Sequence, residues 1–514
     1  MTSGQSMIQT AVDCGVEVCF ANPGTSEMGM VEALDHFDGM RAVLCLFEGV
    51  CSGAADGYAR MAGKPALTLL HLGPGFANSI ANAHNARRAA SPLINLIGDH
   101  PKHHVPYDAP LTSDLEGLAK AASDWHRVSS SAEGLGLDMA EAVAAATRMP
   151  GQVATLIVPS DLAAASVGTK GAPIAPADPP AVSEAAMKQA IAALKSGEPT
   201  ALLLGDRGLH EANVRTAGRI AKATGCKLFA EPFPARWERG AGLPLLGRVP
   251  YFPETVLDFF KDVKHLIVIG TKIPVSFFYY EGYPSELLPE GCEAQILAKP
   301  EDDVVGVLDA LADEFGAAEG DIDTAEFREL DAPTGEIDLA KIGQSVAGLL
   351  PEGAVLMDEA ATSGGSSFVN TRFARPHTYL AITGGSIGFG FPAATGAAIA
   401  CPDRKVVALQ ADGSGMYTVQ ALWTQARESL DVTTVLFSNR RYNILQIELH
   451  RAGIESPGPK AMGLTELTNP ELNWCDIARG MGVPATRPET AEAFHADLAR
   501  ALEEPGPHLI EALI

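Results

Sequence analysis

Short runs of branched and apolar residues alternate along the whole chain with longer segments rich in alanine and leucine. Such runs, bounded by turn residues, are typical of strands buried on both faces, and the segments between them have helical composition. The alternation predicts an α/β protein in which parallel sheets carry helices on both sides. The predicted strands are VEVCFA, AVLCLF, ALTLLH, LINLIG and ATLIVP in the first third, TALLLG, CKLFAE and HLIVIG in the middle, and AVLMDE, VVALQ, TTVLF and HLIEAL in the last third.

Two segments without this alternation divide the chain into thirds. Residues 168–183 are rich in proline, alanine and glycine, and residues 316–338 are acidic and weakly apolar. Both compositions are typical of linkers. We therefore expect three doubly wound parallel-sheet domains, at residues 1–167, 184–315 and 339–514.

The composition limits which partners the protein can have. Its 514 residues are 46% hydrophobic and carry a formal net charge of −25, which argues against nucleic acid or an anionic membrane as a partner. No window approaches the length of an apolar membrane span, and the start MTSGQSMIQT lacks the form of a signal peptide. The eight cysteines show no CxxC spacing, so we expect reduced core thiols in a cytoplasmic protein.

The stretch from Lys405 to Asn439 has the pattern strand, glycine-rich turn, helix, strand. A right-handed crossover places both strand ends on one edge of a parallel sheet, so Asp412 and Asn439 should converge. One carboxylate and one amide oxygen suit Mg²⁺ that completes its shell with phosphate oxygens, and Gly413 lets backbone N–H groups approach those phosphates. The alternative is an ordinary strand–helix–strand unit with an Asp-Gly turn.

A second group of polar residues follows the predicted strands of the first third. Glu48 follows the strand at residues 42–47, His71 ends the next one, and Thr25 lies in a loop after an earlier strand. Loops at the carboxyl ends of parallel strands are where α/β proteins bind ligands, so these three side chains are expected to share a cleft. Apolar neighbours indicate that Glu48 is buried, although it could instead be an ordinary helix-N-terminal acid.

Several motifs together resemble the thiamine diphosphate (ThDP)-dependent decarboxylase and carboligase superfamily. They are FEG…GAADGYAR, HLGPGFAN, GGSIGFGFPAA, the ADG…SN stretch and the closing HLIEAL, which together span nearly the whole chain. The family fingerprint has glycine where this chain has Ala411 and asparagine where it has Ser438, but neither position supplies a side-chain metal ligand.

The resemblance implies ThDP and Mg²⁺ as cofactors and a role for particular residues. Glu48 would hydrogen-bond the aminopyrimidine N1′ of the cofactor and relay a proton through it. Ile387 would support the bent conformation of the cofactor, although plain core packing explains that residue equally simply. The metal ligands would be Asp412, Asn439 and the Arg441 carbonyl, and the other cofactor-binding positions Gly384, Ser386, Gly413 and Ser414.

Relatives bind ThDP between domains of two subunits, which implies a homodimer or homotetramer with the active site at a subunit interface. In that arrangement the first domain binds the pyrimidine and the last binds the diphosphate. The central domain of some relatives holds FAD or ADP. Here the turns of that domain carry no GxGxxG fingerprint, so FAD is not expected.

Local matches favour one branch of the superfamily. The stretches ANPGTSE, LLHLGPG and DAPLTS resemble benzoylformate decarboxylase, in which residues matching Thr25 and His71 bind the substrate carboxylate and move protons. This implies non-oxidative decarboxylation of a 2-oxo acid through an enamine. The alternative is an acetolactate synthase-type carboligase, which the wider pattern also resembles. The chain lacks the Phe-Gln-Glu expected around Leu111 and the Trp expected near Glu448 in that branch.

Other candidates are open to two readings. Leu111, Ile444 and Glu448 match substrate-pocket positions, but Glu448 could equally form a salt bridge with a nearby arginine (440, 441 or 451). The second histidine of benzoylformate decarboxylases is replaced here by Phe278-Tyr279-Tyr280. His103 or His104 could take its role, or could lie on a solvated loop. An inactive regulator would lack Glu48, and a plain nucleotide-binding module would need neither Glu48 nor Ile387.

Overall fold

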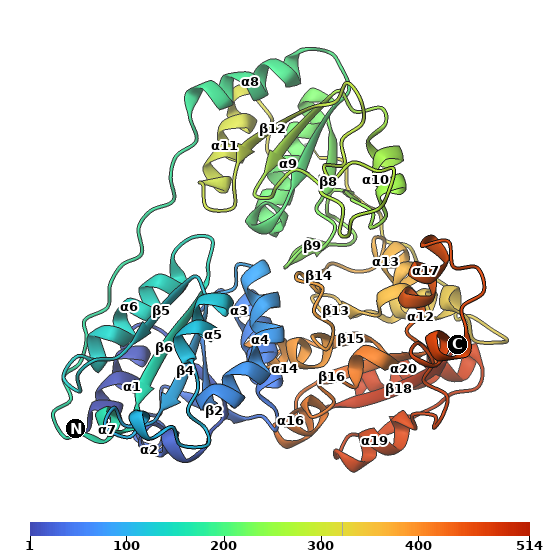
Figure 1. Cartoon of the computed structure of the whole chain (residues 1–514). Coiled ribbons are helices and arrows are strands. Elements are labelled where there is room, and N and C mark those ends of the chain that lie inside the picture. Colours follow the sequence, from blue (N-terminus) through green and yellow to red (C-terminus); the bar gives the residue numbers. More distant parts are fainter. Residues whose placement is uncertain (321) are drawn as a thin grey trace. The chain divides into compact units, whose positions relative to one another are not determined.

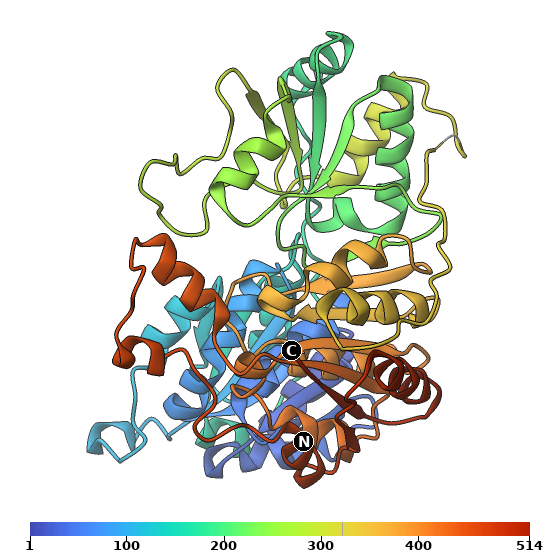
Figure 2. The same cartoon turned by 90° about the vertical axis from the view of Figure 1, so that its right-hand side faces the viewer.

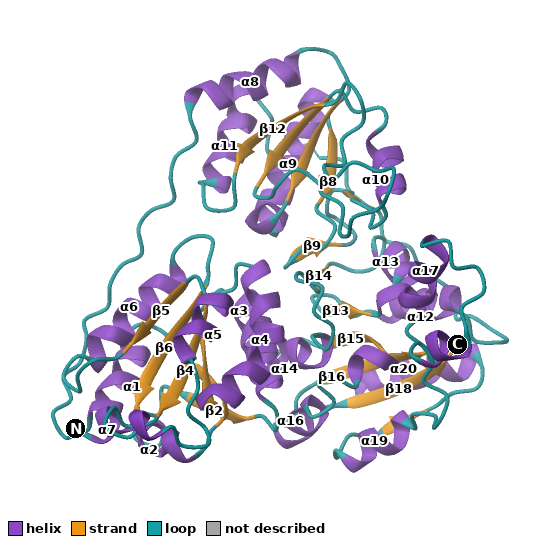
Figure 3. Cartoon of the chain, viewed as in Figure 1, coloured by secondary structure: helices purple, strands orange, loops and turns teal. Residues whose placement is uncertain are grey.

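The computed structural model describes residues 1–320 and 322–514, and Figure 1 traces the chain through it. The chain divides into two compact units. The first comprises residues 1–176, 329–371 and 382–514, and the second comprises residues 177–328 and 372–381. Three sheets, each enclosed between helices, account for both units (Figure 3).

The first sheet has six strands in the order β2-β1-β3-β4-β6-β5, all parallel. Helices α1 and α6 cover one face of it, and α3 and α4 the other (Figure 1). Every residue of β6 is buried, as expected for a strand covered on both sides. The elements are β1 (Val18–Asn22), β2 (Arg41–Leu44), β3 (Ala66–His71), β4 (Leu93–Asp99), β5 (Trp125–Val128), β6 (Val153–Pro159), α1 (Ser3–Asp13), α2 (Met28–Leu34), α3 (Glu48–Ala62), α4 (Leu72–Arg88), α5 (Leu115–Ala122), α6 (Leu135–Thr147) and α7 (Ser160–Ala164).

The sheet of the second unit has five parallel strands in the order β10-β8-β7-β11-β12. Its helices lie on both faces (Figure 2), and α10 packs its phenylalanines against the core of one face. A short antiparallel pair, β9 with β14, also belongs to this unit. The elements are β7 (Thr200–Leu204), β8 (Lys227–Ala230), β9 (Trp237–Arg239), β10 (Gly247–Arg248), β11 (His265–Ile269), β12 (Glu293–Ala298), β14 (His377–Ala381), α8 (Glu184–Lys195), α9 (Glu211–Thr224), α10 (Pro253–Phe260) and α11 (Val304–Glu314).

The third sheet contributes five parallel strands to the first unit, in the order β17-β18-β16-β15-β13. All seven residues of β16 are buried, and each fully buried aliphatic side chain stabilises the fold by about 1.5–3 kcal/mol. The elements are β13 (Val355–Glu359), β15 (Val406–Ala411), β16 (Val432–Ser438), β17 (Ala485–Thr486), β18 (His508–Leu513), α12 (Leu339–Leu349), α13 (Gly365–Thr371), α14 (Gly390–Ala400), α15 (Asp412–Gly415), α16 (Ala421–Arg427), α17 (Asn443–Arg451), α18 (Pro459–Gly463), α19 (Trp474–Gly480) and α20 (Ala491–Glu503).

Helices α3 and α14 join the two sheets of the first unit by unusually close packing. A Cβ atom added at Gly57 would lie 2.1 Å from the Ala393 carbonyl oxygen, and one at Gly396 would lie 1.8 Å from the Ala54 carbonyl oxygen. Only glycine allows backbones to approach this closely. The contact fixes the position of α3, whose first residue is Glu48.

The predicted fold class is confirmed, because three α/β sheets are present and nearly all strand pairs are parallel. One predicted strand was too long: β2 ends at Leu44 rather than at residue 47, and Phe47 is the extended N-cap of α3. The expected linker at residues 168–183 contains neither helix nor strand, and residue 321 of the other expected linker lies outside the described residues. Among the described helices, none has the length and apolar character needed to span a membrane.

Candidate active site

The glycine-rich turn after β15 lies beside the end of β16. The two strands pair in parallel with Ala411 opposite Phe437, so both chains leave the sheet at the same edge. Asp412 Oδ2 accepts a hydrogen bond of 2.6 Å from the Arg440 N–H, and its Oδ1 accepts one of 2.8 Å from the Gly413 N–H. The structure thus brings Asp412 to the loop that begins at Asn439.

The electrostatics of this turn are those of a buried carboxylate. Asp412 is 2% exposed, and burial raises its pKa, although the bonds from the Arg440 and Gly413 N–H groups act in the opposite direction. Asn439 Oδ1 accepts a 3.1 Å hydrogen bond from the Arg441 N–H, which folds the loop back toward its own start. A Cβ at Gly413 would lie 2.5 Å from the Tyr442 ring, so this turn requires glycine.

A cavity of about 280 Å³ opens beside Asn439. Thr362 and Ser363, which follow β13, supply hydroxyl groups to it. The sequence analysis did not single out this pair, although a hydroxyl-rich segment after a predicted strand was a usable signal. The cavity is lined by Ile337, Asp338, Leu339, Thr362, Ser363, Asn439, Arg441, Asn443 and Ile514.

The loop at residues 384–390, which contains three of the expected cofactor-binding residues, is held by helix α4. The Asn85 side-chain amide donates to the Ser386 carbonyl at 2.8 Å and accepts from the Ser386 N–H at 3.2 Å. His84 Nε2 lies 3.2 Å from the Gly384 carbonyl oxygen. Ile387 lies between these contacts and α14 and is half-buried.

The arginine of the GAADGYAR motif fixes the start of the same loop. Arg60 is 7% exposed and forms an ion pair with Asp56 on the preceding turn of α3. It also donates to the Thr383 hydroxyl at 3.1 Å, and its guanidinium lies 4.6 Å from the centre of the Phe389 ring. Helix α3 therefore positions Glu48 at one end and the loop at the other.

Glu48 and His71 meet around Gly75. A Cβ at Gly75 would lie 3.1 Å from Glu48 Oε1 and 3.4 Å from His71 Cβ. Glu48 Oε2 accepts a 3.0 Å hydrogen bond from the Asn78 side chain. Its expected burial is not observed within the single chain: Glu48 is only half-buried, because β2 ends early and Leu46 is 46% exposed.

His71 is held by a buried carboxylate that the sequence analysis missed. His71 Nδ1 lies 2.8 Å from Glu27 Oε2 and 3.1 Å from Ser26 Oγ. Glu27 is fully buried and also accepts a 2.7 Å bond from the Gly24 N–H. Thr25, the residue expected here, is exposed, and its two successors contact the histidine instead. The 3₁₀ turn Thr25–Glu27 has no periodicity from which this could be predicted.

The remaining candidates lie at different positions. Leu111 is 37% exposed, in the loop before α5. Ile444 and Glu448 lie one turn apart on α17, both half-buried. Of the arginines considered as partners for Glu448, Arg440 forms an ion pair with Glu471 at 3.0 Å.

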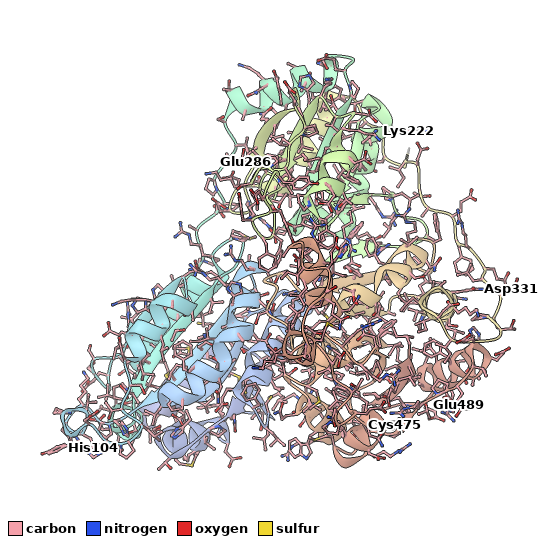
Figure 4. The ribbon with its side chains drawn as sticks, turned by 45° about the vertical axis from the view of Figure 1, so that its right-hand side comes forward. His104, Lys222, Glu286, Asp331, Cys475 and Glu489 are labelled. Atoms are coloured by element: carbon pink, nitrogen blue, oxygen red, sulfur yellow. The ribbon has the colours of Figure 1, made fainter. Side chains whose placement is uncertain are left out.

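The two histidines considered for a proton relay are on the surface. His103 and His104 are both exposed, and Figure 4 shows His104 on the outside of the first unit. The His104 ring packs against His100 and Tyr107, with centroids 5.3 and 6.0 Å apart. This placement favours the solvated-loop reading of the pair.

Two family matches define the class of protein as an enzyme that uses thiamine diphosphate. Residues 1–117 match the family described as "Thiamine pyrophosphate enzyme, N-terminal TPP binding domain", and residues 363–512 match the corresponding C-terminal TPP binding domain. The chain belongs to the thiamine diphosphate-dependent enzymes, among the decarboxylases and acetolactate synthases. The resemblance seen in the sequence is therefore confirmed.

Three known proteins illustrate how similar this chain is to others in sequence and structure. A protein of Mycobacterium tuberculosis, provisionally named acetolactate synthase large subunit IlvX, is 47% identical, with 100% of this chain and 99% of that protein covered. Benzoylformate decarboxylase of Pseudomonas aeruginosa is 26% identical, with 97% and 96% covered. The solved structure of a thiamine diphosphate-dependent 4-hydroxybenzoylformate decarboxylase from Rhodococcus jostii RHA1 has a TM-score of 0.86 at 23% identity, covering 99% of this chain and 98% of that one. The last comparison supports the fold alone.

Proposed function

We propose that the protein is a ThDP- and Mg²⁺-dependent enzyme that decarboxylates a 2-oxo acid without oxidation. The observation that carries this proposal is the histidine–carboxylate pair His71–Glu27, which meets Glu48 around Gly75. This group can bind a substrate carboxylate and move protons, which is what a decarboxylase needs. An acetolactate synthase-type carboligase also releases CO₂, but it joins the remaining carbon skeleton to a second carbonyl compound and needs no proton delivered to the reacting carbon.

The residues present fit the cofactor. Asp412, Asn439 and the Arg441 carbonyl would hold Mg²⁺, because they offer three oxygen types that a hard cation prefers. Among the described residues, no three His, Cys, Asp or Glu side chains form a metal cluster, so this ion would depend on diphosphate oxygens for the rest of its shell. Gly413, Ser414, Thr362 and Ser363 would contact the diphosphate, and Gly384, Ser386 and Ile387 the rest of the cofactor. When bound, ThDP supplies the nucleophilic carbon and the electron sink for decarboxylation.

The protein's own groups handle protons and orientation. Glu48 would hold a proton on Oε1 or Oε2 at the aminopyrimidine. The hydrogen bond from the Asn78 side-chain amide keeps the Glu48 carboxyl group in place. Glu27 fixes the His71 ring through Nδ1, which directs Nε2 to the opposite side, where it can bind the substrate carboxylate or deliver a proton. Thr25, Leu111, Ile444 and Glu448 are proposed to border the substrate.

An acetolactate synthase-type carboligase is the second candidate. Its support is the 47% identity, over the whole chain, to a protein carrying that provisional name. For either reaction we propose the domain boundaries given above, no flavin, and a homodimer or homotetramer with the site between subunits. The half-exposed state of Glu48 in the single chain supports a subunit interface. Eight free cysteines support a cytoplasmic location.

A panel of aromatic and aliphatic 2-oxo acids tests the proposal. Purified protein with ThDP and Mg²⁺ should release CO₂ from at least one of them and yield the corresponding aldehyde. Acyloin or acetohydroxy acid formation at the rate of CO₂ release would favour the carboligase instead. Failure to bind ThDP in the presence of Mg²⁺ would contradict both.

A further inference from the structure

Glu359, the last residue of β13, is a buried carboxylate with an unusual set of partners. It is 3% exposed. Its Oε1 accepts a 2.7 Å bond from the Gly388 N–H, and its Oε2 accepts bonds of 3.0 and 2.6 Å from the N–H groups of Phe389 and Gly390. Three consecutive backbone donors of the loop at residues 384–390 thus point at one side chain.

A glutamine continues this network toward the metal-binding turn. Gln410 lies directly opposite Glu359 on the neighbouring strand β15. Its Nε2 donates to Glu359 Oε2 at 3.0 Å and to Ser414 Oγ at 2.7 Å. Ser414 belongs to the same short helix as Asp412. The hydrogen bonds therefore run without interruption from the loop, through two side chains of adjacent strands, to the Asp412 turn.

Burial raises the pKa of Glu359, and the hydrogen bonds from its four donors act in the opposite direction. The three N–H groups lie at the start of α14, where backbone donors have no partner within the helix and the helix dipole favours an anion. The approach is close, since a Cβ at Gly390 would lie 2.2 Å from Gln410 Oε1 and 3.0 Å from Glu359 Cβ. An apolar residue in place of Glu359 would leave three buried backbone N–H groups without this acceptor, and the Gln410 amide would keep its bond to Ser414. Leaving buried donors unpaired is costly.

We propose that Glu359 is a positioning residue. It holds two halves of the cofactor site, the loop at residues 384–390 and the turn that carries Asp412, in fixed positions relative to each other. This inference rests on the proposed cofactor site and assigns Glu359 no contact with the cofactor. It supplies the acceptor that orders residues 388–390, and through Gln410 it sets the position of the turn that carries Asp412. Both halves would then be ordered before the cofactor arrives, which lowers the entropic cost of binding.

Hydrogen exchange on the protein without cofactor tests the first half of this proposal. Glu359→Gln keeps the side-chain size but places an amide NH₂ against one or more of the N–H donors. The amides of residues 388–390 should exchange at least about tenfold faster than in the wild type. The matched control is Glu511→Gln, because Glu511 is another fully buried glutamate of the same sheet, paired with Arg487 rather than with the loop. Equal protection of the loop in wild type and Glu359→Gln would overturn the proposal.

Cofactor affinity tests the second half. Both Glu359→Gln and Gln410→Leu should weaken ThDP binding in the presence of Mg²⁺ by about 10- to 100-fold, the usual effect of removing a residue that orients a ligating group. At saturating cofactor, kcat should stay within a few-fold of the wild type, since neither residue touches the reacting atoms. Glu359→Asp should recover part of the affinity. Gln410→Leu leaves the three backbone donors bonded, so loop protection should persist in that variant.

The outcomes separate this inference from the proposed function. If the wild type binds no ThDP, the proposed function fails, while the exchange comparison still decides whether Glu359 orders the loop. If the wild type is active and Gln410→Leu binds ThDP with wild-type affinity, the proposed link from Glu359 through Gln410 to the Asp412 turn is wrong, and the proposed function stands. A variant with normal affinity but a reduced kcat would also overturn a purely positioning role.

Discussion

The two ends of the candidate site differ in how complete they are within one chain. Asp412 is almost fully buried and is held by two backbone N–H groups. Glu48 is half-buried, and its donor is the exposed side chain of Asn78. The end that would bind metal and diphosphate is therefore preorganised, whereas the end that would move protons is open. In the proposed oligomer, cofactor affinity would therefore depend mainly on the first end, and a second subunit would complete the surroundings of Glu48.

Removing the preorganised carboxylate should have the largest effect. Asp412→Ala is expected to abolish binding of Mg²⁺ and ThDP together, because a chain of net charge −25 offers the diphosphate little other positive charge. Isothermal titration with each ligand, alone and combined, measures this. Asp403→Ala, in the exposed turn before β15, is the control. Retained affinity for Mg²⁺ and ThDP in Asp412→Ala would contradict the assignment of Asp412 to the metal and diphosphate site.

A substitution of Glu48, at the open end, should leave ThDP binding intact. Glu48→Gln preserves shape but cannot exchange a proton, so turnover and exchange of the thiazolium C2 proton should fall by about 10²–10⁴-fold, with ThDP affinity near the wild-type value. Acid quench followed by NMR measures the exchange. The exposed Glu17→Gln serves as the control. Near-normal exchange in Glu48→Gln would mean that Glu48 is structural.

Replacing His71 should have a smaller effect, on a step that follows activation of the cofactor. His71→Ala is expected to cut 2-oxo acid turnover by about 10²-fold while cofactor affinity and C2 exchange stay nearly intact. Glu27→Gln should give a weaker loss of the same kind, since it disturbs only the orientation of the ring. Single-turnover CO₂ release and the melting temperature should be measured on one preparation, with exposed His104→Ala as the control. A destabilised but fully active His71→Ala protein would rule out catalysis by this residue.

A half-buried carboxylate beside the sheet of the second unit, Glu231, can be compared with these groups. Glu231 follows β8 and accepts bonds from the Asp206 N–H and the Thr271 hydroxyl, and burial raises its pKa to about 7. Between an unfolded pKa near 4.5 and that value, the folded protein retains a proton that the unfolded chain has lost. Stability conferred by this group is therefore present at low pH and is lost as the pH rises to about 7, by up to roughly 3 kcal/mol.

Glu231→Gln should remove this dependence of folding stability on pH without reducing turnover. Urea unfolding of wild type and variant at pH 5 and pH 8 measures the difference, and the variant should gain relative stability at pH 8. A loss of kcat in folded Glu231→Gln protein would show that the strand ends of the second unit's sheet also take part in the chemistry.

The positions that could be predicted from the sequence were those that topology determines. A right-handed crossover leaves two parallel strands at one sheet edge, so the approach of Asp412 to the loop at Asn439 followed from spacing alone. His71 at the end of β3 followed in the same way. These inferences required no knowledge of side-chain packing.

What could not be predicted depends on irregular backbone and on sheet edges. Glu27 lies in a single 3₁₀ turn, and Glu359 acts on a loop 29 to 31 residues further along the chain. Of the six strands that were missed, β5, β9, β10, β12 and β17 end a sheet, where one neighbour is absent and the apolar pattern is weak. The sixth, β14, does not end a sheet; it forms a short antiparallel pair with β9. The predicted strand at residues 42–47 was too long because its last apolar residues lead into α3 rather than into the sheet.

The crossing of α3 and α14 also limits how the sequence can change over generations. At Gly57 and Gly396 a methyl group would collide with carbonyl oxygens of the opposing backbone, which cannot rotate away. At Gly365, by contrast, a methyl group would meet nothing within 4 Å. In a library of random variants, alanine should be common at Gly365 and almost absent at the other two positions. Any descendant of this protein that keeps Glu48 in place is expected to keep those two glycines, however far the rest of its sequence drifts.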